Sequence, residues 1–398
     1  MPQRPASSLP LSVIILLGAL TAFGPLSIDM YLPAFPQIKA DLQAEAVEVT
    51  LAAFLFSMGL CQLFYGPLSD RLGRRGPLMA GCGLFAFGAL GCAVARSIEW
   101  LFFARLLQGF GGAAGVVIAR ACVRDRLNER DSARIFSQLI LVMGIAPILA
   151  PWLGAQILHF TSWRGIFILL TLFGIGCLLA VLRMLPETLP PARRSRGGRT
   201  LRTFGALLRD RAFLGYIVSG GFNSGVLFSY IAGSPFVFLQ YHHLPVTHYT
   251  YLFGANAIGI IGAAQLNQWL LRRRSPETLL SYAFLWNALL GVLLVLHGLS
   301  GWGGFPALVI LVFLSLSAVG IAFPNLTAAA LAAHRDHAGS ASALLGAAQF
   351  LVGASAGFLV GMFNNGTPLA ITAVMGGCGA ASWVILTLLT RPAPRPSR

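Results

Sequence analysis

Long apolar runs separated by short polar segments fill the chain from residue 11 to residue 390. A helix that crosses the roughly 30 Å hydrocarbon core of a bilayer needs about 20 mostly apolar residues. Runs of that length occur at twelve places, with approximate limits of 11–32, 47–66, 77–96, 99–121, 134–156, 165–185, 212–236, 249–270, 278–298, 304–330, 340–362 and 368–390. The pattern predicts an all-α polytopic membrane protein with twelve transmembrane helices.

The segment between the sixth and seventh runs, residues 186–211, has a different composition. It is rich in Pro, Gly and Arg, which is typical of a linker. On each side of it a related polar segment follows the second run, GPLSDRLGRRGPL (66–78) and the more divergent AAQLNQWLLRRRSPETL (263–279). We therefore predict two six-helix halves, 1–185 and 212–398, joined by a cytoplasmic linker over 186–211, as in transporters whose site lies between repeats.

The distribution of basic residues indicates the orientation in the membrane. If the N-terminus lies in the cytoplasm, then 24 of the 28 Lys and Arg residues fall in cytoplasmic segments. Only three fall in outer loops, namely Lys39, Arg96 and Arg164. This asymmetry follows the positive-inside rule and predicts two cytoplasmic termini. The net charge of +15 comes from short Arg clusters between apolar runs, and these lack the interleaved aromatic residues of a nucleic-acid surface, so no nucleic-acid partner is expected.

Two charged residues lie well inside apolar runs. Asp29 is the one acidic residue there, because the other twelve lie in loops or at the ends of runs, and Arg105 is the one basic residue well inside a run. At the helical rise, both are expected about 6–10 Å below the outer membrane surface. An ionised side chain there costs roughly 2.5–3.5 kcal/mol on insertion scales, so we expect the two to stabilise each other. Asp29 then carries a proton or balances a cationic substrate; the alternative is that it lies solvated at the interface or caps a loop.

Other patterns that carry chemistry are weak in this sequence. The six cysteines lie in or beside apolar runs and form no CxxC pair, so we expect them to pack. GFGGAA (109–114) matches a dinucleotide motif but no strand precedes it. No cluster of carboxylates or histidines lies at one membrane face, and no Walker-type glycine loop occurs. The sequence therefore predicts neither an enzyme nor a resident metal or cofactor.

Several motifs carry a family resemblance that covers nearly the whole chain. GPLSDRLGRR (66–75), RLLQG (105–109) and APILAPWLG (146–154) resemble the loop, helix-4 and helix-5 antiporter motifs of the major facilitator superfamily. The helix-5 motif departs from the family in having Ala150 before Pro151 and Ala155 after Gly154. SIDMYLPAFP (27–36), PETLPP in the linker and GSPFVF (233–238) are similar to the Bcr/CflA subfamily of drug/proton antiporters.

The resemblance implies roles for individual residues. A cytoplasmic gate that closes against the start of the eleventh helix, near Ser340, would contain Gly66, Asp70, Gly73, Arg74 and Asp125. Asp29 and Arg105 would serve proton coupling, and Pro151 and Gly154 would kink and thin the fifth helix between the halves. The substrate cavity is expected to contain Tyr31, Gln108, Asn223, Tyr230 and Asn256. Polar residues inside apolar runs either line a cavity or bridge helices, and both alternatives stay open.

The function that the resemblance implies is proton-coupled efflux of small antibiotics by alternating access. Bicyclomycin, sulfonamides and chloramphenicol-type drugs are the expected cargo. Thr21 stands where some relatives have a second acid, which favours neutral or zwitterionic cargo. The expected partners are the drug, protons and the bilayer of a bacterial inner membrane, the protein is expected to be a monomer, and the proton gradient takes the place of a cofactor. The alternative is an exporter of an amino acid or another metabolite.

Overall fold

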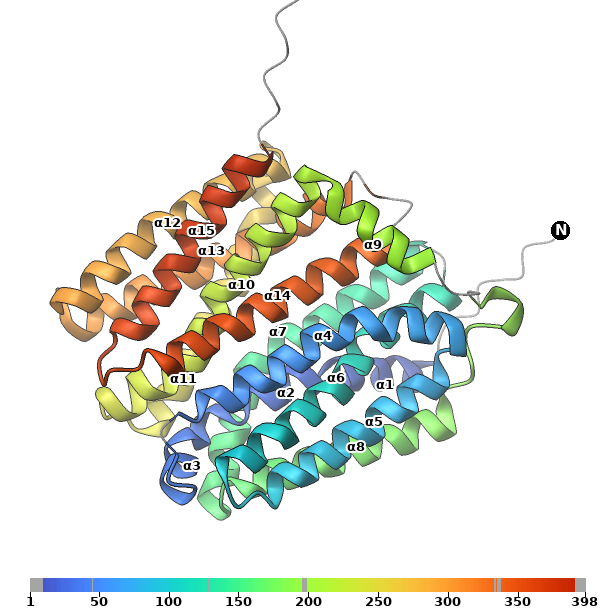
Figure 1. Cartoon of the computed structure of the whole chain (residues 1–398), viewed down its shortest axis with the longest axis horizontal. Coiled ribbons are helices and arrows are strands. Elements are labelled where there is room, and N and C mark those ends of the chain that lie inside the picture. The colour runs from blue at the N-terminus through green and yellow to red at the C-terminus, as the bar shows by residue number, and fades with distance from the viewer. Residues whose placement is uncertain are drawn as a thin grey trace, which may run out of the picture. The chain divides into compact units, whose positions relative to one another are not determined.

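The computed structural model describes residues 10–390 except for residues 45, 128, 195–198, 333 and 335–337. Every regular element in this part of the chain is helical (Figure 1). The earlier elements are α1 (Leu11–Thr21), α2 (Phe23–Asp29), η1 (Leu32–Ala34), α3 (Phe35–Asp41), α4 (Glu48–Leu72), α5 (Arg75–Ala93), α6 (Ile98–Arg126), α7 (Glu129–Phe160), α8 (Arg164–Met184) and η2 (Pro191–Arg193). The later ones are α9 (Arg199–Arg209), α10 (Arg211–Pro235), the π-helix η3 (Phe236–Tyr241), α11 (Val246–Leu270), α12 (Pro276–Ser300), α13 (Gly304–Ala332), α14 (Ala338–Met362) and α15 (Leu369–Thr390). The predicted all-α class is confirmed.

Most of the predicted membrane spans meet the requirements of length and hydropathy. Among the described residues, nine helices are long and apolar enough to cross a membrane, and ten are if the bent pair Leu11–Thr21 and Phe23–Asp41 forms one span. The other two predicted spans coincide with α7, whose described apolar part is Gly144–Phe160, and with α11. The chain is therefore a multi-span membrane protein, and the total of twelve spans stays a prediction.

The helices form two compact units, residues 1–197 with 246–254 and residues 198–245 with 255–398. Within the first unit α5 packs against α6 and α8, and within the second unit α12 packs against α13 and α15 (Figure 1). The helices α5, α6 and α8 correspond to the third, fourth and sixth predicted spans of the first half. The helices α12, α13 and α15 correspond to the third, fourth and sixth predicted spans of the second half. Such recurrence is what related halves would show, while the boundaries at residues 185 and 212 stay predictions.

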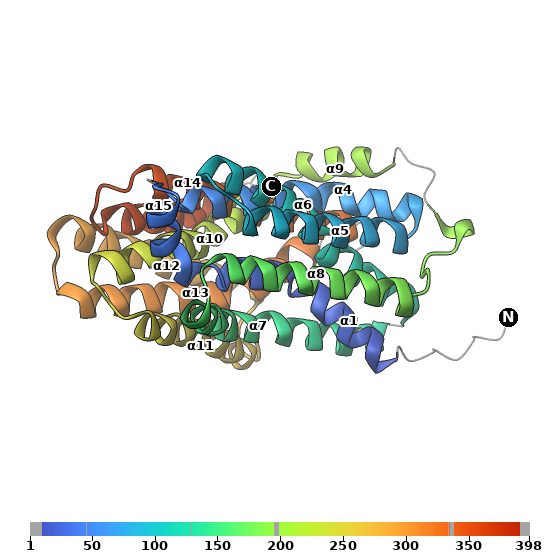
Figure 2. The same ribbon diagram turned by 90° about the horizontal axis from the view of Figure 1, so that it is seen from below.

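The first predicted span is broken near its middle. α1 and the segment Phe23–Asp41 meet at an angle of 42°, and α1 and α7 lie beside α8 (Figure 2). Pro25 explains the break, because its nitrogen cannot donate to the carbonyl oxygen of Thr21 and its ring crowds that oxygen. The break leaves Asp29 as the last residue of α2.

The end of α4 corrects one expectation from the sequence. The second predicted span ends at residue 66, but α4 continues through Gly66 and Pro67 to Leu72. The Ser69 hydroxyl donates to the carbonyl oxygen of Gly66 at 3.0 Å, within the helical turn that contains Pro67. Most of the GPLSDRLGRR motif is therefore helical, and the turn is confined to Gly73 and Arg74.

The segment predicted as a plain linker contains a helix of its own. α9 (Arg199–Arg209) packs against α10 and α14 of the second unit. Leu207 is buried, whereas Leu208 is exposed. The single turn η2 (Pro191–Arg193) precedes α9, so the linker composition did not reveal how much of this segment is ordered.

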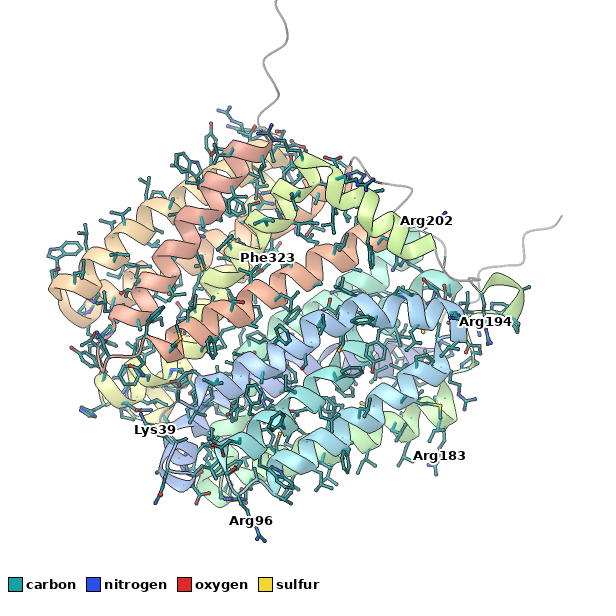
Figure 3. The ribbon with its side chains drawn as sticks, in the orientation of Figure 1. Lys39, Arg96, Arg183, Arg194, Arg202 and Phe323 are labelled. Carbon is teal, nitrogen blue, oxygen red and sulfur yellow. The ribbon has the colours of Figure 1, made fainter. Side chains whose placement is uncertain are left out.

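Basic residues from predicted outer loops and from predicted cytoplasmic segments lie at opposite ends of the first unit. Lys39 and Arg96 lie at one end, and Arg183 and Arg194 lie at the other (Figure 3). This separation is what the predicted topology requires. Which end faces the cytoplasm stays a prediction, and the two ends are called outer and inner below on that basis.

Candidate functional site

At the inner end of α4, the Arg74 side chain holds three acceptors together. Its Nη1 atom donates to Asp70 Oδ1 at 2.5 Å and to Ser69 Oγ at 2.8 Å, and its Nε atom donates to Asp125 Oδ2 at 2.8 Å. We call Ser69, Asp70, Arg74 and Asp125 the Arg74 cluster. The side chains of Arg74 and Asp125 are 8% and 16% exposed, so salt screens this pair less than it screens an exposed ion pair. The predicted association of Asp70, Arg74 and Asp125 is therefore present, while its role as a gate stays a prediction.

Glu187 completes this site, and the sequence reasoning gave it no role. Its carboxylate accepts from the backbone N–H groups of Arg74 at 2.8 Å, Arg75 at 3.2 Å and Leu189 at 2.9 Å. Two of these donors lie at the N-terminus of α5, where a helix favours a negative charge. Beside it, the Thr188 hydroxyl donates to Asp125 Oδ2 at 3.1 Å. An isolated acid just after the sixth apolar run, in an otherwise basic segment, was the available signal.

The electrostatic environment of Glu187 favours its ionised form. Partial burial raises the pKa of the carboxyl group, but the three backbone donors and the nearby Arg194 guanidinium outweigh it, so the pKa lies below its usual range. The charged carboxylate therefore stabilises the fold above the pKa of the unfolded chain. This contribution is lost as the pH falls through the lowered pKa of the folded state.

Replacement of Glu187 by glutamine is expected to lower the melting temperature of the purified protein at neutral pH. The glutamine side chain has no negative charge to stabilise the N-terminus of α5. Only one of its two terminal atoms is an oxygen, so it cannot accept all of the hydrogen bonds that the carboxylate accepts. The difference from the wild type should begin to shrink as the pH falls below the ordinary glutamate pKa of about 4.3, and it should vanish once the pH has fallen through the lowered pKa of the folded state. Thermal unfolding in detergent at several pH values measures this, and a difference that is independent of pH would contradict the electrostatic explanation.

Gly73 fits this site for two reasons, whereas Gly66 has no such constraint. Gly73 has φ +98°, in the region that favours glycine. A Cβ atom there would also crowd the Glu187 carboxylate and lie 2.9 Å from Arg194 Nη2. At Gly66 no described atom lies within 4 Å of the position of a Cβ atom. The structure therefore gives a packing reason for Gly73 alone.

Removal of the Asp70 side chain is expected to slow transport several-fold while leaving substrate affinity nearly unchanged. In the Asp70→Ala variant, the Arg74 side chain still forms its hydrogen bonds with Asp125 and Ser69, but its ion pair with the carboxylate of residue 70 is lost. Asp70 lies near the inner end of α4, 16 residues along this helix from Phe54, which contacts the Arg105 guanidinium. Turnover and binding measured separately on the same preparation test the expectation, and a change confined to affinity would contradict it.

In the interior of the first unit, Arg105 is completely buried and bound mainly to uncharged groups. Its Nη1 atom donates to Gln108 Oε1 at 2.7 Å, and Gln108 Nε2 donates to Ser27 Oγ at 3.4 Å. The Cys92 thiol also contacts Gln108 Oε1 at 4.0 Å. We call Ser27, Cys92, Arg105 and Gln108, with the aromatic residues described next, the Arg105 cluster. Gln108, expected in the cavity, thus orients Arg105.

Three aromatic rings surround the Arg105 guanidinium. Its carbon atom lies 4.4 Å from the ring centre of Phe54, 4.8 Å from that of Tyr31 and 5.8 Å from that of Phe167. Cation–π attraction to desolvated rings partly replaces hydration of the charge. The Nε and Nη2 atoms are buried and have no acceptor among the described residues, so the guanidinium retains hydrogen-bonding capacity.

Asp29 does not form the ion pair with Arg105 that its depth in the sequence suggested. Among the described residues, no hydrogen bond or ion pair joins the two side chains, which is a correction to the expected mutual stabilisation. The alternative of a solvated Asp29 is also wrong, because the residue is only 4% exposed. Asp29 is therefore a buried carboxyl group at the end of a broken helix, and no basic side chain in the described part of the chain pairs with it.

Gly154 of the antiporter motif lies against the backbone of the residue that follows Asp29. A Cβ atom on Gly154 would overlap the carbonyl oxygen of Met30, which follows Asp29 in the chain. Glycine thus lets the α7 backbone touch the backbone at the end of α2. Pro151, one turn earlier, is buried inside α7. The close approach that the structure shows for Gly154 is to Met30, within the first unit. The predicted thinning of this helix between the halves stays a prediction.

The remaining cavity candidates lie in the second unit. Asn256 Nδ2 donates to the Tyr230 hydroxyl at 2.8 Å, which joins α11 to α10. Asn223 is fully buried, and neither atom of its amide has a hydrogen-bond partner among the described residues. An unsatisfied buried amide is costly, and a ligand or water would satisfy it. The roles of these three residues as cavity lining stay predictions.

A pair of amides in the second unit corresponds to the Arg74 cluster in position. Asn267, within the segment that resembles GPLSDRLGRR, exchanges hydrogen bonds with Asn325, at 2.7 Å and 3.4 Å. Both side chains are buried. The sequence reasoning left open whether Asn325 lines a cavity or bridges helices, and the structure shows that it bridges α11 and α13.

Comparison with known proteins identifies the family. The sequence profile of the Major Facilitator Superfamily matches residues 17–357. The chain belongs to the Major Facilitator Superfamily. It is accordingly a membrane transporter and not an enzyme.

Two superfamily relatives match over nearly their whole length. The uncharacterized MFS-type transporter YdgK of Bacillus subtilis is 37% identical over 381 residues, covering 94% of each chain. A bicyclomycin resistance protein homolog of Haemophilus influenzae is 32% identical over 390 residues, covering 95% of this chain and 96% of the relative.

A crystal structure of the nucleoside transporter NupG has a TM-score of 0.72 at 16% identity and covers 95% of this chain and 98% of NupG. The last likeness concerns the fold alone.

Proposed function

We propose that this transporter exports small antibiotics in exchange for protons across a bacterial inner membrane. The observation that carries the proposal is Asp29, a buried carboxyl group that forms no ion pair with any residue the structure describes. Burial in proteins favours the protonated form of a carboxyl group, and a change in conformation that admits water or a cation favours the ionised form. Alternation between these environments moves a proton across the membrane.

The proposed direction is export driven by proton entry. Each 100 mV of membrane potential supplies about 2.3 kcal/mol per charge moved, so no nucleotide is needed. The relative named as a bicyclomycin resistance protein homolog supports an antibiotic as cargo. The absence of a second acid in the first helix, at Thr21, favours neutral or zwitterionic compounds such as bicyclomycin, sulfonamides or chloramphenicol.

Inside-out membrane vesicles with an imposed pH gradient test this function. Bicyclomycin, a sulfonamide, chloramphenicol and cysteine are added in turn, and proton release is followed with a quenched dye. A drug-dependent response supports drug/proton antiport, whereas a response to cysteine alone supports export of a metabolite. The proposal fails if none of the drugs moves protons although the protein is present and folded in the vesicles.

A further inference from the structure

An ion pair joins separate segments of the chain at the outer end of the first unit. Asp41 is the last residue of α3 and Arg164 is the first residue of α8. Arg164 Nη1 donates to Asp41 Oδ2 at 2.5 Å. Arg164 Nη2 donates to the carbonyl oxygen of Ala95, in the turn between α5 and α6, at 2.9 Å. The pair therefore ties α3 and α8 to this turn, and the function proposed above gives it no role.

Trp163, which precedes Arg164, is held by α3 at two points. Its backbone N–H donates to Gln37 Oε1 at 2.9 Å, and its indole Nε1 donates to Asp41 Oδ2 at 3.0 Å. Gln37 and Asp41 are four residues apart, so α3 presents both acceptors on one face. The carbon atom of the Arg164 guanidinium lies 4.3 Å from the Trp163 ring centre. We call Gln37, Asp41, Trp163 and Arg164 the Asp41 cluster.

Side-chain contacts continue from the Asp41 cluster to the Arg105 cluster. The rings of Trp163 and Phe167 are perpendicular, with their centres 6.0 Å apart. The Phe167 ring centre lies 5.4 Å from that of Tyr31 and 5.8 Å from the carbon atom of the Arg105 guanidinium. An unbroken series of contacts thus leads from the outer end of the unit to its buried cation.

The outer part of this series is exposed and the inner part is not. The side chains of Asp41 and Arg164 are 44% and 34% exposed, whereas Trp163 and Arg105 are 1% and 0% exposed. An exposed ion pair contributes little to stability and therefore opens readily. If Asp41 moved away, the indole N–H of Trp163 would stay buried without an acceptor, which is costly. Trp163 is therefore expected to move with the pair.

We propose that the Asp41–Arg164 pair is a latch at the outer end of the first unit, and that its release opens the Arg105 cluster to water from that side. In the closed form described here, the pair holds Trp163, Trp163 packs against Phe167, and Phe167 lies beside the guanidinium. Asp41 and Arg164 are thus positioning residues that act on Arg105 through two aromatic rings. The inference concerns access to the cluster, so it depends neither on the cargo nor on proton coupling.

Hydrogen–deuterium exchange, measured by mass spectrometry on the purified full-length protein in detergent, tests the latch. In Asp41→Asn the side-chain oxygen can still accept from Trp163, but the ion pair with Arg164 is lost, so the latch should open more often. Exchange should become several-fold faster in the segments that carry Tyr31 and Phe167, because backbone exchange reports local opening. Asp41→Glu should restore the wild-type rates.

Two controls separate the latch from a general loosening of the fold. Arg96→Gln neutralises an exposed arginine at the same end of the unit (Figure 3) and should match the wild type. The segment around Gly73, at the inner end, should exchange at the wild-type rate in Asp41→Asn. Unchanged exchange around Tyr31 and Phe167 overturns the inference, and so does equally accelerated exchange around Gly73.

Arg164→Gln removes the other partner of the pair and keeps Asp41, so the test does not depend on the folding of one variant. It should accelerate exchange in the same segments. The double variant Asp41→Asn with Arg164→Gln should exchange no faster than the faster single variant, because both changes break one interaction. Multiplied effects would show that the two residues act separately and would overturn the latch. The measurement uses no drug and no pH gradient, so a failure of the proposed antiport leaves its outcome unaffected.

Discussion

Asp29→Asn is expected to abolish proton-coupled drug export while leaving the protein folded and inserted in the membrane. Asparagine keeps the size of the side chain but cannot exchange a proton. Because Asp29 binds no cation among the described residues, its loss leaves no buried positive charge without a partner, and stability should change little. The substrate-dependent dye response in inside-out vesicles should fall to background, and thermal unfolding in detergent should remain close to the wild type.

The matched control for Asp29→Asn is Glu99→Gln, which neutralises an exposed acid in the first turn of α6. Its proton response should equal that of the wild type. Normal coupled export by Asp29→Asn would eliminate this residue as the proton carrier. The groups around Arg105 would then be the next candidates.

Gly154→Ala is expected to reduce coupled export at least tenfold and to destabilise the protein by about 1–3 kcal/mol, the usual range for overpacking a well-packed interior. The added methyl group would overlap the Met30 carbonyl oxygen. That oxygen belongs to the backbone and cannot rotate away, so α7 or the end of α2 must move. Either movement displaces the chain immediately after Asp29.

Gly176→Ala on α8 is the matched control, because no described atom lies within 4 Å of the position of its Cβ atom. Alanine is favoured over glycine in a helix by up to about 1 kcal/mol, so this variant should be as stable as the wild type or more stable. Transport assays and thermal unfolding on both variants separate the effect of close packing from the effect of helix propensity. Equal behaviour of the two variants would contradict the steric explanation.

The sequence predicted the Arg74 cluster well because the relevant information is local. Asp70 and Arg74 are four residues apart, a spacing that brings side chains together on a helix, and the family resemblance added Asp125. Glu187 was missed because it approaches from another part of the chain, more than 100 residues after Arg74. No local spacing encodes such a contact.

The predicted pairing of Asp29 with Arg105 failed for a geometric reason. Counting residues along a helix gives depth in the membrane, but it does not give the direction in which a side chain points. Arg105 instead donates to Gln108, three residues later on the same helix, a partner that its own helix supplies. The break after Thr21 also changes the direction of the helix that carries Asp29, and depth counted along a straight helix does not include that bend.

The six cysteines give the chain a chemical reporter of its own motion. All six are free and buried, so a water-soluble thiol reagent finds no accessible target in the conformation described here. Cys92 lies against Gln108, within one hydrogen bond of the Arg105 guanidinium. A transport cycle that opens this region to water exposes the Cys92 thiol. Labelling of the unmodified protein, with and without drug, would therefore report when the Arg105 cluster opens, without an introduced probe.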